Sequence, residues 1–144
     1  MDLSFAFFAD NATVPADGKV YVLGGGFSAL ALPALPGRVT FAVVAGFRFA
    51  GEDAGKTHLV ELRFLDMDGK LVLPVATLQF QSAGVAPDTD REVSVSTVTY
   101  LSPMLGDAGL YTVQFWAGDR PLASLRLTVE AQQAAPVDEG SRPN

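Results

Sequence analysis

The sequence contains no cysteine and only one histidine, His58. Without cysteine, the chain forms no disulfide, holds no zinc–thiolate site and performs no thiol catalysis. A triad or general base built on histidine would have to use His58, whose place beside Lys56 and Thr57 is typical of a solvated surface residue. One histidine is also too few for the usual multi-histidine metal sites. These absences count against an enzyme, and we expect a non-enzymatic protein without a cofactor or metal.

Basic residues are few and scattered along the chain. Ten Lys and Arg stand against sixteen Asp and Glu, which gives a net charge of −6 and a pI of about 4.5. Nucleic acids and anionic lipid surfaces are bound by clustered cations. The sequence therefore predicts neither a nucleic-acid partner nor a membrane partner.

A long uninterrupted hydrophobic run is also missing. The longest uncharged stretch, Val20 to Gly37, is broken by glycines and prolines, whereas a membrane-spanning helix needs about 20 consecutive, mostly apolar residues. Asp2 stands where a secretory signal would carry Lys or Arg. We therefore expect a cytoplasmic protein.

The hydrophobic period is two along most of the chain, and no window keeps a helical period over three turns. The segment Arg38 to Phe49 is the clearest case, because alternate residues from Val39 to Phe49 are all apolar. It predicts a long strand with one face in the core. Further strands are predicted at Leu3 to Ala9, Lys19 to Leu23, Phe27 to Leu32, His58 to Asp66, Leu71 to Phe80, Arg91 to Tyr100, Leu110 to Ala117 and Leu122 to Val129.

Turn residues separate these strands, with Asp-Gly at 17–18 and 68–69 and Gly-Asp at 118–119. Many short strands with regular turns indicate an all-β fold, a two-sheet antiparallel sandwich with an extra N-terminal strand or hairpin. We expect one domain over residues 1–130, in which Leu30 to Gly37 connects the sheets, and a disordered tail over residues 131–144. The predicted core consists of Phe41, Val43, Phe47, Leu62, Phe64, Val93, Val95, Tyr111, Val113 and Phe115.

The run from Asp107 to Val113, Asp-Ala-Gly-Leu-Tyr-Thr-Val, resembles the tyrosine corner of immunoglobulin-like sandwiches. That resemblance implies that the Tyr111 hydroxyl bonds to the backbone near Asp107. Val113 stands where antibody domains carry a cysteine, so the core must be held by packing alone. A jelly-roll or C2-like sandwich is the competing topology.

A second resemblance covers most of residues 1–130. Gly-Lys at 18–19, three glycines at 24–26, Asp-Met-Asp-Gly at 66–69 and Gly-Leu-Tyr at 109–111 occur in this order. This order resembles that of a family of small bacterial proteins without an assigned function. The resemblance implies a bacterial source and a single domain, and it implies no activity.

Three local patterns resemble functional motifs. The glycines Gly24, Gly25 and Gly26 lack the following helix that a phosphate loop needs, so they predict a bulge or tight turn. Ser28 lacks the second glycine of a nucleophile elbow, and we interpret it as a structural or surface serine.

Acidic residues form the third pattern, since loops at one end of a sandwich can pool oxygen ligands for calcium. They lie in two predicted loops, with Asp66 and Asp68 in one and Asp88 and Asp90 in the other. The full calcium-loop pattern is missing. A small-molecule or calcium-binding sandwich of the C2 or lectin kind is therefore the alternative function.

The favoured function is protein–protein contact or self-association. In the strand Leu110 to Ala117 the core residues leave Trp116 on the opposite face. The same alternation turns part of His58 to Asp66 outward, beside Trp116 in an immunoglobulin-like sandwich. The predicted interface consists of Trp116, Gln114, Leu59, Leu65 and Arg63. A two-fold homodimer is the simplest assembly, and the alternative is that the N-terminal segment Leu3 to Leu32 covers this patch.

Overall fold

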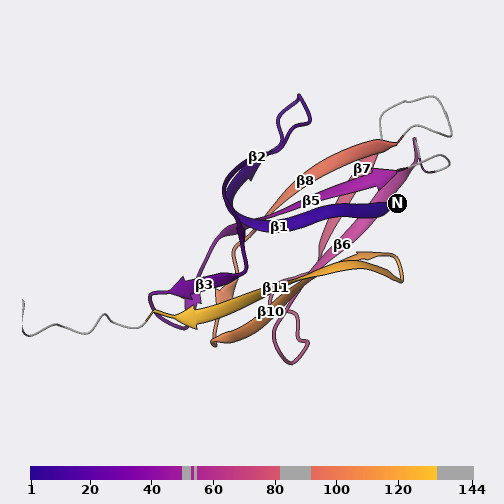
Figure 1. Cartoon of the computed structure of the whole chain (residues 1–144). Helices are drawn as coiled ribbons and strands as arrows, with labels where there is room; N and C mark the ends of the chain where they lie inside the picture. The colour runs from indigo at the N-terminus through magenta and orange to yellow at the C-terminus, as the bar shows by residue number, and fades with distance from the viewer. Residues whose placement is uncertain (50–52, 54, 82–91, 133–144) are drawn as a thin grey trace, which may run out of the picture.

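The computed structural model describes residues 1–49, 53, 55–81 and 92–132. Within these ranges its regular elements are strands (Figure 1). They are β1 (Asp2–Thr13), β2 (Tyr21–Phe27), β3 (Ala29–Leu32), β4 (Gly37–Arg38), β5 (Phe41–Phe49), β6 (Thr57–Leu65), β7 (Ala76–Gln81), β8 (Val93–Leu101), β9 (Met104–Leu105), β10 (Gly109–Ala117) and β11 (Arg120–Ala131). The prediction of an all-β fold is confirmed.

The strands form two larger sheets and one small one. The four-stranded sheet has the order β2-β1-β5-β8, the five-stranded sheet has the order β3-β11-β10-β6-β7, and β4 pairs with β9. Every pair is antiparallel except β3 with β11, which is parallel, so the prediction of wholly antiparallel sheets is wrong at this edge. The reason is the connection after β2, which crosses to the other sheet and enters it beside the last strand.

One hydrophobic core fills the space between the two larger sheets. It joins Phe8, Phe41, Phe47 and other residues of the first sheet to Phe64, Phe115 and other residues of the second. Eight of the ten predicted core residues are buried, namely Phe41, Val43, Phe47, Leu62, Phe64, Tyr111, Val113 and Phe115. Val93 and Val95 are only half-buried, because they lie on the edge strand β8.

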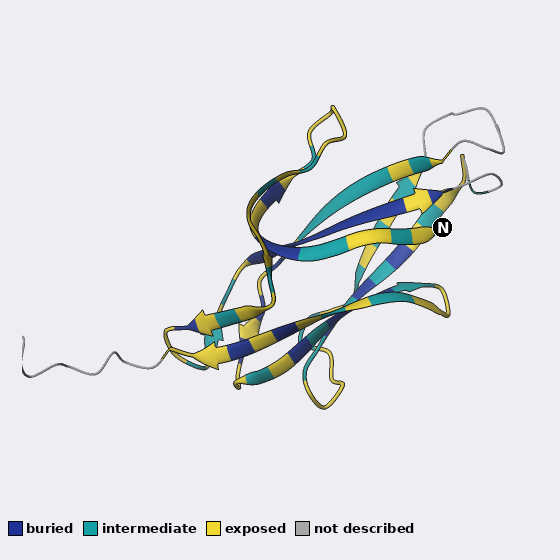
Figure 2. Cartoon of the chain, in the orientation of Figure 1, coloured by how far each residue is buried: buried dark blue, intermediate teal, exposed yellow. Residues whose placement is uncertain are grey.

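Strand β5 is buried on both faces, so the prediction of a single buried face is wrong. Figure 2 shows the buried colour along most of this strand. The residues that point away from the main core, Ala42 and Val44, are 0% exposed and form a second cluster with Ala9 and Ala12. Side chains of β1, β2 and β8 cover this second cluster, as described below.

Several strand boundaries differ from the predicted ones for local reasons. β7 begins at Ala76 and not at Leu71, because Pro74 has no N–H to donate to a neighbouring strand. Arg38 belongs to β4, and β5 begins at Phe41. At the C-terminus β11 includes Ala131, so the tail predicted from residue 131 begins too early, and residues 133–144 lie outside the described part.

The predicted turns occur where the glycines stand. Gly18 and Gly69 have φ angles of 75° and 77°, a conformation that is available to glycine at little cost. Their amides donate to the carbonyls of Pro15 and Asp66. The first turn closes the β1–β2 hairpin, and the second places the acidic residues between β6 and β7.

Candidate functional site

The five residues predicted as an interface lie on the outer side of the five-stranded sheet. Gln114 is paired with Arg63 and Thr112 with Leu65 across β10 and β6, while the alternate residues Val113 and Phe115 point into the core. Leu59 lies two residues beyond the partner of Trp116 on β6 and is 56% exposed. We call these five residues, Trp116, Gln114, Leu59, Leu65 and Arg63, the Trp116 surface.

Polar neighbours hold the indole of Trp116 in place. Its Nε1 donates a hydrogen bond of 3.0 Å to Oε1 of Gln114, and the guanidinium carbon of Arg63 lies 4.7 Å from the ring centroid. Arg63 also donates to Glu61 at 2.8 Å. Charged and polar groups therefore contact the half-buried ring on its edge and on its face.

The N-terminal segment does not cover the Trp116 surface. β1 and β2 belong to the four-stranded sheet, and β3 joins the five-stranded sheet at the edge farthest from β6 and β7. The alternative in which residues 3–32 fold over Trp116 is therefore wrong. Instead, β1 pairs with β5 in the four-stranded sheet, where its inward side chains Ala6 and Phe8 pack in the main core.

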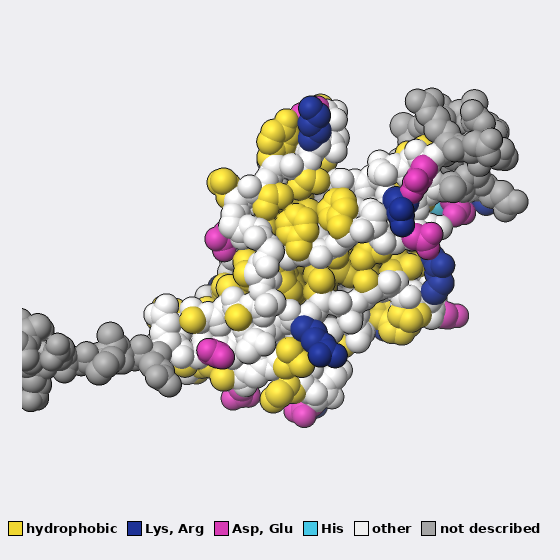
Figure 3. All heavy atoms as spheres, viewed as in Figure 1, with side chains coloured by type: hydrophobic (Ala, Val, Ile, Leu, Met, Phe, Trp, Pro, Cys, Tyr) yellow, Lys and Arg dark blue, Asp and Glu magenta, His cyan; other side chains and the backbone are white. Residues whose placement is uncertain are grey.

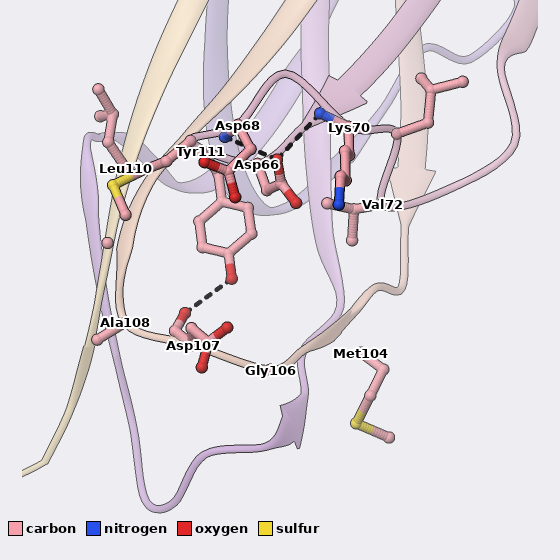
Figure 4. A pocket seen from close by; sticks show the side chains of 13 residues that line it. Asp66, Asp68, Lys70, Val72, Met104, Gly106, Asp107, Ala108, Leu110 and Tyr111 are labelled. Carbon is pink, nitrogen blue, oxygen red and sulfur yellow. Dashed lines mark hydrogen bonds between the residues drawn. The ribbon is translucent and has the colours of Figure 1, made fainter.

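Tyr111 makes the predicted hydrogen bond. Its hydroxyl donates to the carbonyl of Asp107 at 2.7 Å, and its ring stacks on Phe64 with the centroids 5.6 Å apart. The bond closes the loop between β9 and β10. This loop and Tyr111 form one wall of an open pocket of about 350 Å³, and Met67, Leu71, Met104 and Leu110 also line the pocket (Figure 4).

The acidic loop beside this pocket is explained by its turn. Oδ1 of Asp66 accepts the backbone N–H groups of Asp68 and Lys70 at 2.9 and 3.0 Å, so this carboxylate stabilises the turn. Asp88 and Asp90 lie outside the described residues. Among the residues that are described, no group of three or more acidic or histidine side chains is placed to hold a metal ion.

The remaining candidates of the sequence have structural positions. The β1–β2 register shifts between Phe8 and Ala9, opposite the glycines, and Gly24 and Gly26 have φ angles of 62° and 89°, so the predicted bulge is confirmed. Ser28 is exposed, as predicted. The prediction of a solvated His58 is wrong, since its half-buried ring stacks on Phe49 at 4.4 Å and its Nε2 lies 2.9 Å from the Asp53 carbonyl.

The structure brings together a second surface that the sequence reasoning missed. On the outer side of the four-stranded sheet, Phe5 and Phe7 stack with their ring centroids 6.0 Å apart. Phe7, Val22 and Val98 pack on the buried cluster of Ala9, Ala12, Ala42 and Val44, and Phe5 is 39% exposed. Figure 3 shows hydrophobic side chains gathered where β1 and β2 lie. We call Phe5, Phe7, Val22, Val98 and Tyr100 the aromatic face.

Two contacts fix the shape of the aromatic face. The ring of Phe5 lies directly over Gly46, where a Cβ atom would stand 2.1 Å from the ring. The hydroxyl of Tyr100 accepts the N–H of Ala12 at 3.0 Å and lies 2.7 Å from the Ala12 carbonyl, so it ties β8 to β1 across β5. Val22 and Phe7 line a shallow depression with Gly25 and Gly26.

Two carboxyl groups at the margins of this sheet have lowered pKa values. The hydroxyl of Tyr21 and the N–H of Lys19 donate to Asp17 in the β1–β2 hairpin and lower the pKa of that carboxyl. The N-terminal ammonium group donates to Asp53 at 2.9 Å and lowers the pKa of Asp53. Both carboxyl groups are paired by neighbours in the folded chain, and neither is placed for acid–base chemistry.

A comparison with protein families gives one match. A family of unknown function, DUF6941, matches residues 4–130. The chain belongs to the DUF6941 family. The resemblance to a family without an assigned function is thereby confirmed, and the match spans the region predicted as one domain. None of the curated proteins compared with this DUF6941 chain matches it. The described residues contain no helix long and apolar enough to cross a membrane.

Proposed function

We propose that this DUF6941 protein is a non-enzymatic, immunoglobulin-like β-sandwich that acts by binding another protein. The strand order supports the fold assignment, because β5 lies between β1 and β8 in one sheet and β10 lies between β6 and β11 in the other. Strands B, E, C, F and G of the immunoglobulin fold have the same neighbours when they are equated with β5, β8, β6, β10 and β11.

The aromatic face carries the proposal of binding. It presents the stacked rings of Phe5 and Phe7 on the outer side of the sheet. The outward residues that lie across the sheet from Phe5 on β1, through β5, to Tyr100 on β8 are uncharged. At one end of this face Arg48 and Glu92 form an exposed ion pair of 3.3 Å. Protein interfaces have this composition, with aromatic residues and few charges at the centre and a polar rim. The predicted partner therefore offers an apolar, uncharged surface.

The Trp116 surface is the second candidate for the same function. Trp and Arg often contribute strongly to binding energy, and Leu59 is exposed beside them. However, the indole N–H of Trp116 and the guanidinium of Arg63 already form hydrogen bonds with Gln114 and Glu61, so fewer of their polar groups are left for a partner. The aromatic face presents stacked apolar rings, and we favour it.

Photo-crosslinking from each surface tests the proposal. The protein is produced in its native host with p-benzoylphenylalanine in place of Phe5 or, as the matched variant, in place of Trp116. We expect a discrete, saturable adduct from position 5, its loss in a chain that also carries Phe7→Ser, and no adduct from position 116. An adduct from position 116 alone would move the function to the Trp116 surface. The absence of any adduct from both positions would refute the proposed function.

A further inference from the structure

The two larger sheets have four edge strands, and three of them have features that hinder pairing with another strand. β2 is bulged and carries Gly24 and Gly26 in left-handed conformations. β3 has four residues and is followed by Pro33, and β7 has six residues and follows Pro74 by two positions. Short, bulged or proline-flanked edges are the usual protection against unwanted strand pairing.

The fourth edge, β8, has none of these features. All nine of its residues pair in continuous register with β5, from Val93 opposite Phe49 to Leu101 opposite Phe41. The segment contains no glycine, proline or charged residue and is rich in Val and Thr, which favour strands. Among the described strands, the backbone of β8 pairs with β5 alone. About half of its backbone N–H and C=O groups therefore face away from the sheet.

We propose that β8 pairs antiparallel with β8 of a second copy of this chain. A two-fold axis at Thr97 would place Val93 of one copy opposite Leu101 of the other and use all nine residues of each strand. The four strands of each copy would then join into one continuous sheet of eight. Such a contact is self-complementary, as a closed two-fold interface requires, and it completes backbone hydrogen bonding in the way of β-augmentation.

The charges at the two ends of β8 support a second copy as the partner. Glu92 precedes the strand and is exposed, and its carboxylate forms an ion pair of 3.3 Å with Arg48 of the same copy. At the other end, Nη1 of Arg38 donates to the carbonyl of Ser102 at 3.1 Å, which holds its exposed guanidinium at the residue after Leu101. In the antiparallel register Glu92 of each copy lies opposite Ser102 of the other. The dimer therefore brings Glu92 of each copy near Arg38 of the other, twice by symmetry.

The proposal does not depend on the proposed function, although the two concern one sheet. Pairing through β8 would place two aromatic faces side by side, because Val98 and Tyr100 lie on the outer side of β8. A partner of the aromatic face would then meet one larger surface. The two ideas are tested separately, since Phe5 and Phe7 lie on β1, which β5 separates from β8.

The first test is the mass of the full chain in solution, measured by light scattering over a range of concentrations. We expect about twice the 15.2 kDa of one chain. Ser96→Lys should give the mass of one chain with an unchanged circular dichroism spectrum, since Ser96 lies on the outer side of the edge strand and a lysine there opposes strand pairing. Phe5→Ser should leave the dimer intact. A monomeric wild type, or a dimer that Ser96→Lys leaves unchanged, would overturn the proposal.

Charge exchange tests the register. Glu92→Arg and Arg38→Glu should each weaken dimerisation, by about threefold to tenfold, because each places like charges at both symmetric contacts. The double variant should recover the affinity. If the double variant dimerises as weakly as the single variants, this register is refuted.

Crosslinking tests the edge in an otherwise unchanged chain, which remains informative if Ser96→Lys does not fold. Because the sequence has no cysteine, Ser96→Cys introduces a unique thiol. In the proposed register the two Ser96 residues are diagonal neighbours about 7–8 Å apart, within reach of a bismaleimide of about 10 Å. Gln79→Cys on the exposed edge β7 is the matched control. We expect a crosslinked dimer from position 96 and none from position 79, and the reverse result would assign the contact to the five-stranded sheet.

Discussion

The outer sides of the two larger sheets differ although both follow the same alternation of side chains. On the four-stranded sheet the outward residues Ala42, Val44 and Gly46 of β5 are apolar, and side chains of neighbouring strands cover them, as Phe5 of β1 covers Gly46. On the five-stranded sheet the outward residues of β6 and β10 are partly polar. Arg63 donates to Glu61, and Trp116 donates to Gln114. The first surface is held by packing and the second by polar contacts. A large outward residue whose polar groups already bind its neighbours is therefore weaker evidence of binding than exposed rings that are held by packing alone.

The largest expected effect concerns the core that both sheets share. The rings of Phe41 and Phe64 come from different sheets and meet edge to face with centroids 6.0 Å apart. Either Phe41→Ala or Phe64→Ala should lower the free energy of unfolding by about 3–5 kcal/mol, because each leaves a cavity among buried side chains. Chemical denaturation measures this loss. A loss below about 1 kcal/mol at both positions would mean that the sheets do not share this core.

The next effect separates the two outer sides. Gly46→Ala places a methyl group where the ring of Phe5 lies, and it should cost about 1–2 kcal/mol of unfolding free energy while it turns Phe5 toward solvent. Thr112→Ala, on the outer side of the other sheet, should change it by less than about 0.5 kcal/mol.

A double-mutant cycle identifies the cause of the Gly46→Ala effect. In a chain that already carries Phe5→Ala, the cost of Gly46→Ala should disappear, because the clashing ring is gone. If the cost stays the same in that background, the contact between Phe5 and Gly46 is not what distinguishes this surface.

Two tyrosines allow a smaller comparison between the sheets. Tyr111→Phe removes the bond to the Asp107 carbonyl, and Tyr100→Phe removes the bonds to the backbone of Ala12. Each should lower the free energy of unfolding by about 0.5–1.5 kcal/mol, with Tyr100 at the upper end because the Ala12 N–H also loses its acceptor. Thermal and chemical unfolding of both variants measure the difference. If Tyr100→Phe leaves the free energy of unfolding unchanged, the hydrogen bonds between β8 and β1 do not contribute to stability.

The smallest expected effect tests how Trp116 is held. Arg63→Ala should lower the free energy of unfolding by about 0.5–1 kcal/mol, because it removes the cation from the indole face. Trp116 is the only tryptophan, so its fluorescence reports the change directly, and its emission should move to longer wavelength. Arg126→Ala, on the neighbouring strand β11, is the control and should leave the emission unchanged. Equal shifts in the two variants would contradict a specific contact with Arg63.

Much of the core could be predicted because it depends on alternation within single strands. The period of two in β5, β6 and β10 identifies the inward residues, and Asp-Gly pairs identify the turns at 17–18 and 68–69. The hydrogen bond from Tyr111 to Asp107 spans only four residues, so a local motif is enough to predict it. The alternation also identified the Trp116 surface as a set of outward residues.

The aromatic face could not be derived in this way, because its residues come from segments that are distant in the sequence. Phe5 and Gly46 meet only because β1 pairs with β5, and Tyr100 reaches Ala12 across a third strand. The one available signal was the run from Phe41 to Phe47, which is apolar at every position. Such a run is typical of a strand that is buried on both faces.

The sequence alone determined that this chain forms strands, where most of them turn, and which side chains point inward, because these properties depend on neighbours along the chain. The tertiary structure decided which strands lie at the edges, that β3 runs parallel to β11, and which outward residues are covered. Strand order is set by contacts between distant segments, and periodicity carries no information about them. The position of β8 at an edge of the described sheet and the aromatic face both arise from that order, and so these two surfaces became visible only in the folded chain.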